Sequence, residues 1–196
     1  VRAVCSGHPL ADSIPMPFQS EHGREIAFLP GSRRQEISLL LKPMMDSFII
    51  LRDSGIVSNA TVAVSSDVSA ELYELAVNTE GVRLADSIED ALENASAAVV
   101  CSGTATLETA MWGIPFIITY KTSSFTYFLA RILVSGVSSI GMANLVADSE
   151  IVAELIQKDV YPENIVRYLI PLLEDTEARK KSLKGLKLVR DALGEM

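Results

Sequence analysis

The sequence has few of the residues that build metal or disulfide sites. Its 196 residues contain only two cysteines and two histidines. The cysteines, Cys5 and Cys101, are far apart without the spacing of a metal site, and no Asp-x-Asp pair is present, so we expect no bound metal ion. Isolated thiols of this kind are typical of a reduced, cytoplasmic protein.

Positive charge and long apolar runs are also scarce. The 17 Lys and Arg residues against 25 Asp and Glu residues give a net charge of −8, which argues against nucleic acid as a partner. We find no signal peptide and no uninterrupted apolar run of about 18 residues. The sequence does not begin with Met, and its opening, "VRAVCSGHPLAD", is typical of a strand inside a larger fold. We therefore expect that an N-terminal domain is missing.

What is present is an alternation of apolar runs and helical segments. Apolar residues make up 48% of the chain and charged residues 21%, which allows a sizeable core. Apolar runs that alternate with helices predict a Rossmann-like, doubly wound α/β domain around a parallel sheet. The expected strands are 24–30, 60–66, 82–86, 97–103 and 115–121, and the expected helices between them are 31–55, 69–81, 87–95 and 104–113.

Local signals mark where the expected helices begin and end. Ser32 and Gln35 fit a capping box at the start of the first helix, and Ser87 and Asp90 are placed as caps of the third. Gly113 is placed to end the fourth helix. Everything after residue 123 is expected to be mostly helical.

Two turns of this predicted fold share one design. "LPGSRRQE" and "CSGTATLE" each leave an apolar strand, pass through Gly31 or Gly103, and open a helix. Glycine lets the backbone approach a ligand closely, and a helix N-terminus attracts anions. Neither turn is a P-loop or a G-x-G-x-x-G motif. Each turn is therefore either a phosphate site or a tight corner between strand and helix.

Two charged residues of these turns bear on that choice. Arg33, beside a helix N-terminus, has the chemistry to bind a phosphate with two hydrogen bonds; the alternative is a solvated arginine, which fits Arg34 better. Glu108 is suited to accept hydrogen bonds from two neighbouring ribose hydroxyls. The alternative for Glu108 is a first-turn carboxylate favoured only by the helix dipole.

Five segments, in this order, carry a resemblance to a known family. They are "GHPLADSIP" (7–15), "LPGSRRQEI" (29–37), "CSGTATLETAMWGIPFIITYK" (101–121), "SFTYFLARILV" (124–134) and "ANLVADSEIVAELIQ" (143–157). The set resembles the C-terminal half of the lipid-A-disaccharide synthases, glycosyltransferases of lipopolysaccharide and lipid A biosynthesis in Gram-negative bacteria. Each motif is modest, but the ordered set is specific and covers residues 4 to 175.

The resemblance implies a glycosyltransferase-B architecture, in which a nucleotide-sugar cleft lies between two Rossmann-like halves. On this reading residues 1–22 are a linker from the missing domain, 23–160 are the UDP-sugar-binding domain, and 161–196 are a helical tail. The implied reaction transfers the sugar of UDP-2,3-diacylglucosamine to 2,3-diacylglucosamine 1-phosphate with inversion, by direct displacement. UDP-sugar is a substrate, and no cofactor is expected.

The resemblance also implies roles for individual residues. His8 would touch the sugar or the diphosphate, or act with Asp12 only at the crossover between the domains. Asn144, Glu154 and Gln157 would line the cleft, with Glu154 and Gln157 on one helical face. Candidates for catalytic contacts are Arg33, Asn144 and Gln157. The expected substrate-binding residues are His8, Gly31, Ser32, Arg33, Ser102, Gly103, Thr104, Ala105, Glu108, Asn144 and Glu154.

The family places its general base in the N-terminal half, so we expect this chain to bind UDP but to have negligible turnover alone. Residues 124–134 form an expected helix that is apolar nearly all round, with Arg131 as its only charge. Such a helix is usually buried. Alternatively it rests, with Lys121 and Arg131 beside it, at the inner face of the membrane, which would make the cytoplasmic protein peripheral.

Three readings of function thus remain open. The first is the lipid-A-disaccharide synthase half, alone or as a homo-oligomer. The second is another UDP-N-acetylglucosamine enzyme of similar fold, either a peptidoglycan N-acetylglucosaminyltransferase or a 2-epimerase. The third is a non-catalytic oligomerisation module, in which both turns are only corners. Binding of UDP separates the third reading from the first two, and acylated against unacylated donors separate the first from the second.

Overall fold

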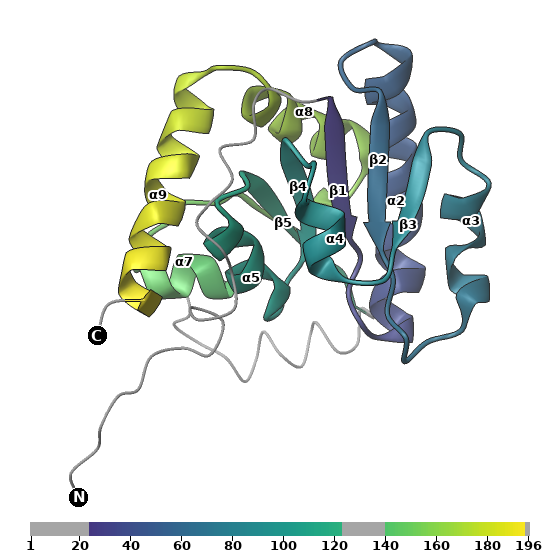
Figure 1. Cartoon of the computed structure of the whole chain (residues 1–196), viewed down its shortest axis with the longest axis horizontal. Coiled ribbons are helices and arrows are strands. Elements are labelled where there is room, and N and C mark those ends of the chain that lie inside the picture. Colours follow the sequence, from purple (N-terminus) through teal and green to yellow (C-terminus); the bar gives the residue numbers. More distant parts are fainter. Residues whose placement is uncertain (1–23, 123–139, 195–196) are drawn as a thin grey trace, which may run out of the picture.

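The computed structural model describes residues 24–122 and 140–194 (Figure 1). Its six strands are parallel and form one sheet in the order β3-β2-β1-β4-β5-β6. The chain first builds the sheet outward from β1 to β3, then returns to the other side of β1. Winding therefore reverses between β1 and β4. The strands are β1 (Glu25–Leu29), β2 (Asn59–Ala63), β3 (Val82–Ala85), β4 (Ala97–Cys101), β5 (Phe116–Tyr120) and β6 (Glu154–Ile156).

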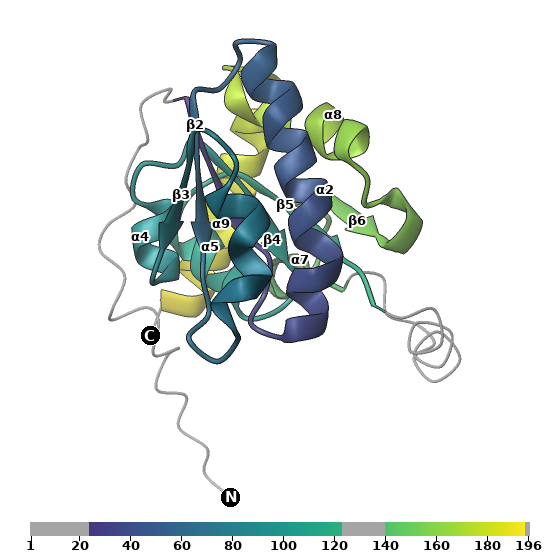
Figure 2. The ribbon, with the colours of Figure 1, turned by 90° about the vertical axis from the view of Figure 1, so that its right-hand side faces the viewer.

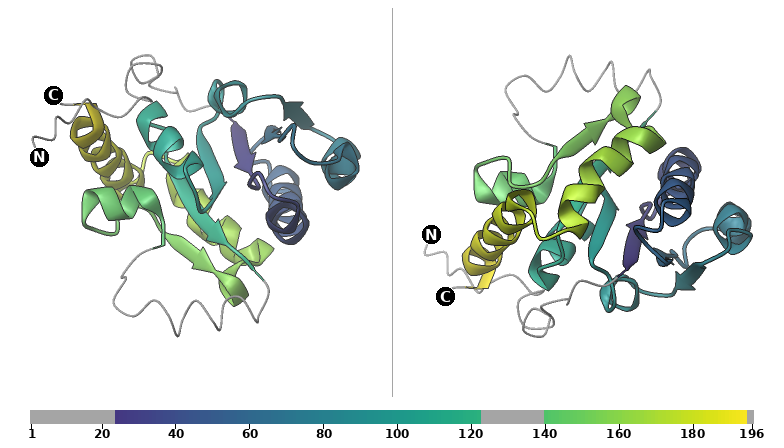
Figure 3. Two further views of the ribbon diagram at one scale, coloured as in Figure 1. Left: turned by 90° about the horizontal axis from the view of Figure 1, so that it is seen from below. Right: turned by 90° about the horizontal axis from the view of Figure 1, so that it is seen from above.

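Helices cover both faces of the sheet, which gives three layers (Figures 2 and 3). One face carries α2 (Arg34–Asp53), the short η1 (Ala70–Tyr73) and α3 (Glu74–Val77), and α8 (Pro162–Leu173). The opposite face carries α4 (Ile88–Leu92), α5 (Ala105–Trp112), α7 (Met142–Ala147) and α9 (Glu177–Gly194). A single turn, η2 (Gln157–Asp159), follows β6. This is the expected Rossmann-like doubly wound α/β fold.

The central strands explain why their sequences are continuous apolar runs. In β1, Ile26 and Phe28 enter the core beneath α2 and α8, while Ala27 and Leu29 enter the core beneath α4 and α5. A parallel strand that is covered on both faces has no solvent side, so both of its side-chain sets are apolar. The five expected strands are confirmed at these positions, with ends that differ by a few residues.

Several local expectations are confirmed and others are wrong. The Ser87 hydroxyl accepts a hydrogen bond from Asp90 N at 3.0 Å and so caps α4. Gly113 ends α5 in the left-handed region, at φ 71°. The helix expected over 69–81 is instead the short pair η1 and α3. The strand β6 was not expected, because residues after 123 were predicted to be mostly helical.

The two C-terminal helices pack on the sheet, α8 in the layer on one face and α9 in the layer on the other. Helix α8 lies beside α2, and α9 lies beside α5 on the other side of the sheet (Figure 3). The buried Arg179 of α9 donates a hydrogen bond to Ser96 O, just before β4, at 2.9 Å, and another to Leu172 O at the end of α8. One guanidinium thus links both helices to the edge where β4 begins.

The position of α9 depends on the absence of a side chain at Gly185. A Cβ atom there would lie 2.6 Å from Cβ of Ile151. Alanine usually favours a helix over glycine by about 0.5–1 kcal/mol, but overpacking costs about 1–3 kcal/mol. We expect Gly185→Ala to lower the midpoint of thermal unfolding by several degrees, measured by calorimetry. Lys184→Ala, on the exposed side, is the control; a midpoint for Gly185→Ala at or above that of the wild type would contradict the contact.

Within the part of the chain that the structure describes, no helix is both long and apolar enough to cross a bilayer. His8 and Asp12, and the expected apolar helix 124–134, lie outside the described residues.

Candidate functional site

The two turns singled out in the sequence lie side by side at the carboxyl edge of the sheet. They leave the neighbouring strands β1 and β4, in which Leu29 pairs with Val100. Gly31 adopts φ 105°, and a Cβ atom there would lie 3.2 Å from Sγ of Cys101. The turns are therefore in contact, at the point where the winding of the sheet reverses. Ligands of open α/β sheets bind at such points.

The N-terminus of α2 is occupied by a side chain of its own helix. Oε2 of Glu36 accepts hydrogen bonds from Ser32 N and Arg33 N, both at 3.2 Å, and Oε1 accepts one from Nη1 of Arg33 at 2.9 Å. Arg33 is the N-cap residue, so the expected capping box of Ser32 and Gln35 is wrong by one position. The side chain of Arg33 is 81% exposed. The donors that were expected to face a diphosphate are thus held by Glu36.

The N-terminus of α5, by contrast, is open. The backbone N–H groups of Gly103, Thr104 and Ala105 meet no acceptor within the described parts of the chain. A Cβ atom at Gly103 would have no neighbour within 4 Å, so space lies directly in front of this turn. Three unpaired donors and the positive end of the α5 dipole point to a site for an anion.

Glu108 lies in the first turn of α5 and is half-buried. Burial raises the pKa of its carboxyl group, and the nearby carboxylate of Glu89 raises it further. No cation or hydrogen-bond donor of residues 24–122 or 140–194 contacts the Glu108 carboxylate. Burial removes water from this carboxylate, and no protein donor of the described residues replaces that water. The carboxylate is therefore suited to bind a ligand that supplies hydrogen-bond donors.

Ser102, Asn144 and Glu154 form one hydrogen-bond network. The Glu154 carboxylate accepts from Ile140 N at 2.9 Å, from Gly141 N at 3.0 Å and from Nδ2 of Asn144 at 2.8 Å. The Ser102 hydroxyl donates to Ile140 O at 3.0 Å. Three of the expected site residues, from the turn after β4, from α7 and from β6, are thus brought together at the start of α7.

The same contacts make Asn144 a structural residue. It is 2% exposed, and its Oδ1 accepts from Ile151 N and Val152 N, both at 3.0 Å, while Nδ2 also donates to Val152 O at 2.8 Å. Because each polar atom of the side chain is already bonded, the geometry does not support the expected catalytic contact. Asn144 instead positions the segment that leads into β6.

Gln157 stands out by its geometry. It begins η2 with φ 53°, in the left-handed region that non-glycine residues rarely adopt. Its Oε1 accepts from Thr122 N at 3.3 Å, but its Nε2 is buried without a partner among the described residues. Glu154 lies in β6 and Gln157 in η2, so the expectation that they share one helical face is wrong. Backbone strain together with an unpaired amide is typical of functional positions.

Sequence reasoning missed Glu36 and the setting of Cys101. Glu36 gave no signal, because Arg33 is not a residue type that usually forms an N-cap. Cys101 is buried behind Gly31, and burial, followed by the charge of Glu36, raises the pKa of its thiol to about 12. A raised pKa keeps the thiol in its protonated form at neutral pH, which disfavours a role as a nucleophile.

Within residues 24–122 and 140–194, no three His, Cys, Asp or Glu side chains are grouped to hold a metal ion. Charged side chains at the edge of β1 and β4 include Arg33, Glu36, whose carboxylate is already bonded, and Glu108, and the open donors there are the backbone N–H groups of Gly103, Thr104 and Ala105. This donor set suits an anionic ligand that carries hydroxyl groups better than it suits a cation.

Comparison with known proteins gives the family. A family model described as lipid-A-disaccharide synthetase matches residues 1–196. The lipid-A-disaccharide synthase of Persephonella marina (strain DSM 14350 / EX-H1) is 34% identical over 206 residues, which cover 96% of this chain and 54% of that protein. The corresponding protein of Anaeromyxobacter dehalogenans (strain 2CP-C) is 35% identical over 208 residues, covering 100% and 54%.

Solved structures agree on the fold. CalG4, the calicheamicin glycosyltransferase, superposes with a TM-score of 0.59 at 13% sequence identity, covering 91% of this chain and 40% of that one. The chain spans about half the length of the curated relatives that it matches. The match along its whole length shows that this chain belongs to the lipid-A-disaccharide synthase family.

Proposed function

We propose that this chain is the nucleotide-binding half of an inverting glycosyltransferase that makes the lipid A disaccharide. The donor would be UDP-2,3-diacylglucosamine and the acceptor 2,3-diacylglucosamine 1-phosphate. The observation that carries the proposal is the open N-terminus of α5 beside the turn of Gly31, at the reversal point of the sheet. Family membership supports the same reaction. Because both substrates carry acyl chains, the transfer would take place on the cytoplasmic side, at the inner face of the membrane.

The proposed binding mode differs between the two turns. The diphosphate would lie against the N–H groups of Gly103, Thr104 and Ala105, because those of the first turn are already bonded to Glu36. Arg33, exposed at the rim, would reach the same phosphates from the side. Glu108 would accept hydrogen bonds from the two ribose hydroxyls and thereby offset its own desolvation.

These groups suit the charge that develops during transfer. When the acceptor hydroxyl attacks the anomeric carbon, the bond from that carbon to the UDP oxygen breaks and negative charge grows on the diphosphate. A charge-assisted hydrogen bond from Arg33 contributes about 1.5–3 kcal/mol, and the α5 dipole contributes up to about 2 kcal/mol. The proton of the acceptor hydroxyl would pass to a general base that lies outside these 196 residues. The isolated chain would then bind UDP without turning over.

Calorimetric titration with UDP tests this proposal. We expect saturable binding by the wild-type chain, and Arg33→Ala should weaken it about tenfold, the loss of one charge-assisted hydrogen bond. Arg34→Ala is the matched control, since Arg34 is the next exposed arginine and begins α2. If the wild type released no heat, the non-catalytic module would be favoured. If Arg33→Ala and Arg34→Ala lost the same affinity for UDP, Arg33 would contribute only its positive charge and not a specific hydrogen bond.

Joining the chain to its N-terminal half would then separate the enzymatic readings. A lipid-A-disaccharide synthase uses the acylated donor, whereas a peptidoglycan transferase or a 2-epimerase uses UDP-N-acetylglucosamine. Turnover of the unacylated donor alone would overturn the lipid A assignment while leaving the UDP site intact.

A further inference from the structure

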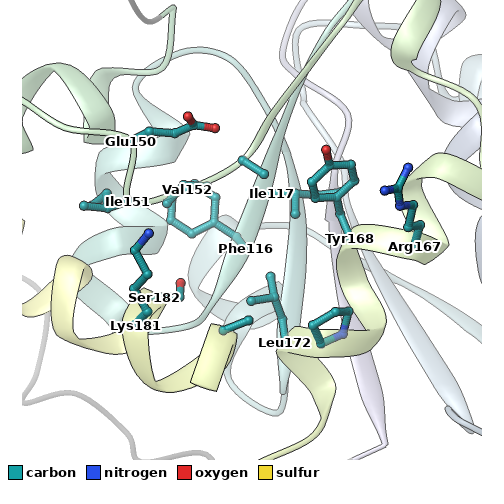
Figure 4. A pocket seen from close by; sticks show the side chains of 13 residues that line it. Phe116, Ile117, Glu150, Ile151, Val152, Arg167, Tyr168, Leu172, Lys181 and Ser182 are labelled. Atoms are coloured by element: carbon teal, nitrogen blue, oxygen red, sulfur yellow. The ribbon is translucent and has the colours of Figure 1, made fainter. Parts of the chain in front are cut away.

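A cavity lies away from the proposed nucleotide site. It opens between the beginnings of β5 and β6 and the helices α8 and α9, and its volume is about 460 Å³ (Figure 4). The proposed nucleotide site lies at the opposite, carboxyl edge of the sheet, beyond the ends of β1 and β4. A ligand in this cavity would therefore not touch the turns at Gly31 and Gly103.

The floor of the cavity is apolar. Phe116 and Ile117 come from the start of β5, Val152 from the segment before β6, and Leu172 from the end of α8. All four are buried side chains of the two cores. Such a floor accommodates an aliphatic chain better than a sugar or a nucleotide.

One end of the cavity is polar and carries one ammonium group, from Lys181, and one carboxylate, from Glu150. Lys181 and Ser182, consecutive residues of α9, line it together (Figure 4). Lys181 forms no ion pair within the described parts of the chain, whereas its neighbour Lys180 lies 3.4 Å from Asp175 and 3.6 Å from Glu177. Glu150 also lines the rim but makes no ion pair with Lys181. The ammonium group at this end is thus available to an anion.

Ser182 gives an independent sign of a missing ligand. It is 4% exposed, and its hydroxyl is buried without a hydrogen-bond partner in the described structure. An unpaired buried hydroxyl costs about 1–3 kcal/mol, so native proteins rarely retain one without a reason. The hydroxyl lies on the side of α9 that lines the cavity (Figure 4).

We propose that this cavity binds an anion that carries a short aliphatic chain. The anionic head group lies at the α9 end, where it accepts a hydrogen bond from the Ser182 hydroxyl and faces the ammonium group of Lys181. The chain lies on Phe116, Val152 and Leu172 and points toward Tyr168 of α8. Arg167, beside Tyr168 at the far mouth, keeps the field of the cavity positive against the single carboxylate of Glu150.

Titration of the full chain with hexyl phosphate, followed by amide NMR, tests the proposal. Saturable shifts are expected at residues 117, 152 and 182. Inorganic phosphate and hexanol should each bind at least tenfold more weakly, because the first lacks the aliphatic chain and the second lacks the anionic group. Comparable binding of either simple compound, or no saturable binding of hexyl phosphate, would overturn it. UDP, as a separate titrant, should shift residues 103–105 instead, so this proposal and the nucleotide site fail independently.

Variants sharpen the test. Lys181→Gln should weaken hexyl phosphate at least tenfold, while Lys184→Gln, an exposed change on the same helix outside the cavity, should not. Ser182→Ala removes the unpaired hydroxyl, so the unfolding midpoint should stay or rise while hexyl phosphate binds several-fold more weakly. A Ser182→Ala chain that is more stable and binds hexyl phosphate as tightly as the wild type would contradict a role for the hydroxyl.

Discussion

Gly103→Asp is expected to weaken UDP binding by about 10- to 100-fold while leaving the fold as stable as before. The new carboxylate would stand in open space, because a Cβ atom at this position has no neighbour within 4 Å. It would also lie at the N-terminus of α5, where the helix dipole attracts it into the place of the diphosphate. Loss of one or two charge-assisted hydrogen bonds, about 1.5–3 kcal/mol each, accounts for the expected factor.

Two variants at the same position separate charge from size. Gly103→Asn has nearly the same shape as the aspartate without its charge, and Gly103→Ala adds only a methyl group; both should bind UDP within a few-fold of the wild type. Calorimetric titration gives the affinities, and thermal unfolding checks stability. Equal affinity of Gly103→Asp and Gly103→Asn for UDP would show that the diphosphate does not lie at this helix.

Asn144→Ala is expected to lower the free energy of unfolding by about 3 kcal/mol. The amide side chain bonds the backbone of Ile151 and Val152 and the carboxylate of Glu154. Alanine leaves these buried polar groups without hydrogen-bond partners. Each such group that water cannot reach costs about 1–3 kcal/mol of stability. For a chain of this size, a loss of about 3 kcal/mol lowers the midpoint of thermal unfolding by roughly 6–12 °C.

The matched control is Asn94→Ala, an exposed asparagine whose side chain forms no hydrogen bond within the described structure. It should change the midpoint by less than about 2 °C. If Asn144 were a catalytic residue without a structural role, Asn144→Ala would unfold like the wild type. Denaturant and thermal unfolding followed by circular dichroism distinguish the two outcomes.

The sheet was predictable because its signals are local. Residues 26–29 and 97–101 are apolar runs too short for helices, and each is followed within two residues by a glycine and then by a helical pattern. The cap at Ser87 is equally local, since the hydroxyl and the N–H that it accepts lie three residues apart. The two turns lie side by side because β1 and β4 are adjacent parallel strands whose carboxyl ends meet at one edge of the sheet.

What escaped prediction depends on tertiary contacts. Three residues, Glu154–Ile156, form a strand because β5 provides the pairing edge, and nothing in their own sequence requires it. The resemblance gave Asn144 a catalytic role, but the sequence does not show whether the fold already satisfies the hydrogen bonds of this side chain. The Glu36 carboxylate accepts a hydrogen bond from Arg33 N at the start of α2. The sequence did not predict this contact, because arginine is not a typical N-cap residue.

The ends of the sheet have a consequence for self-association. Among the strands of residues 24–122 and 140–194, the two flanking ones are the shortest: β3 has four residues and β6 has three, against five in each of the others. An edge strand can pair with a strand of another chain through its unpaired N–H and C=O groups, and strands as short as β3 and β6 offer few such groups. Copies of this protein that associate would therefore meet through helical surfaces, and the sheet of one copy would not continue into the next.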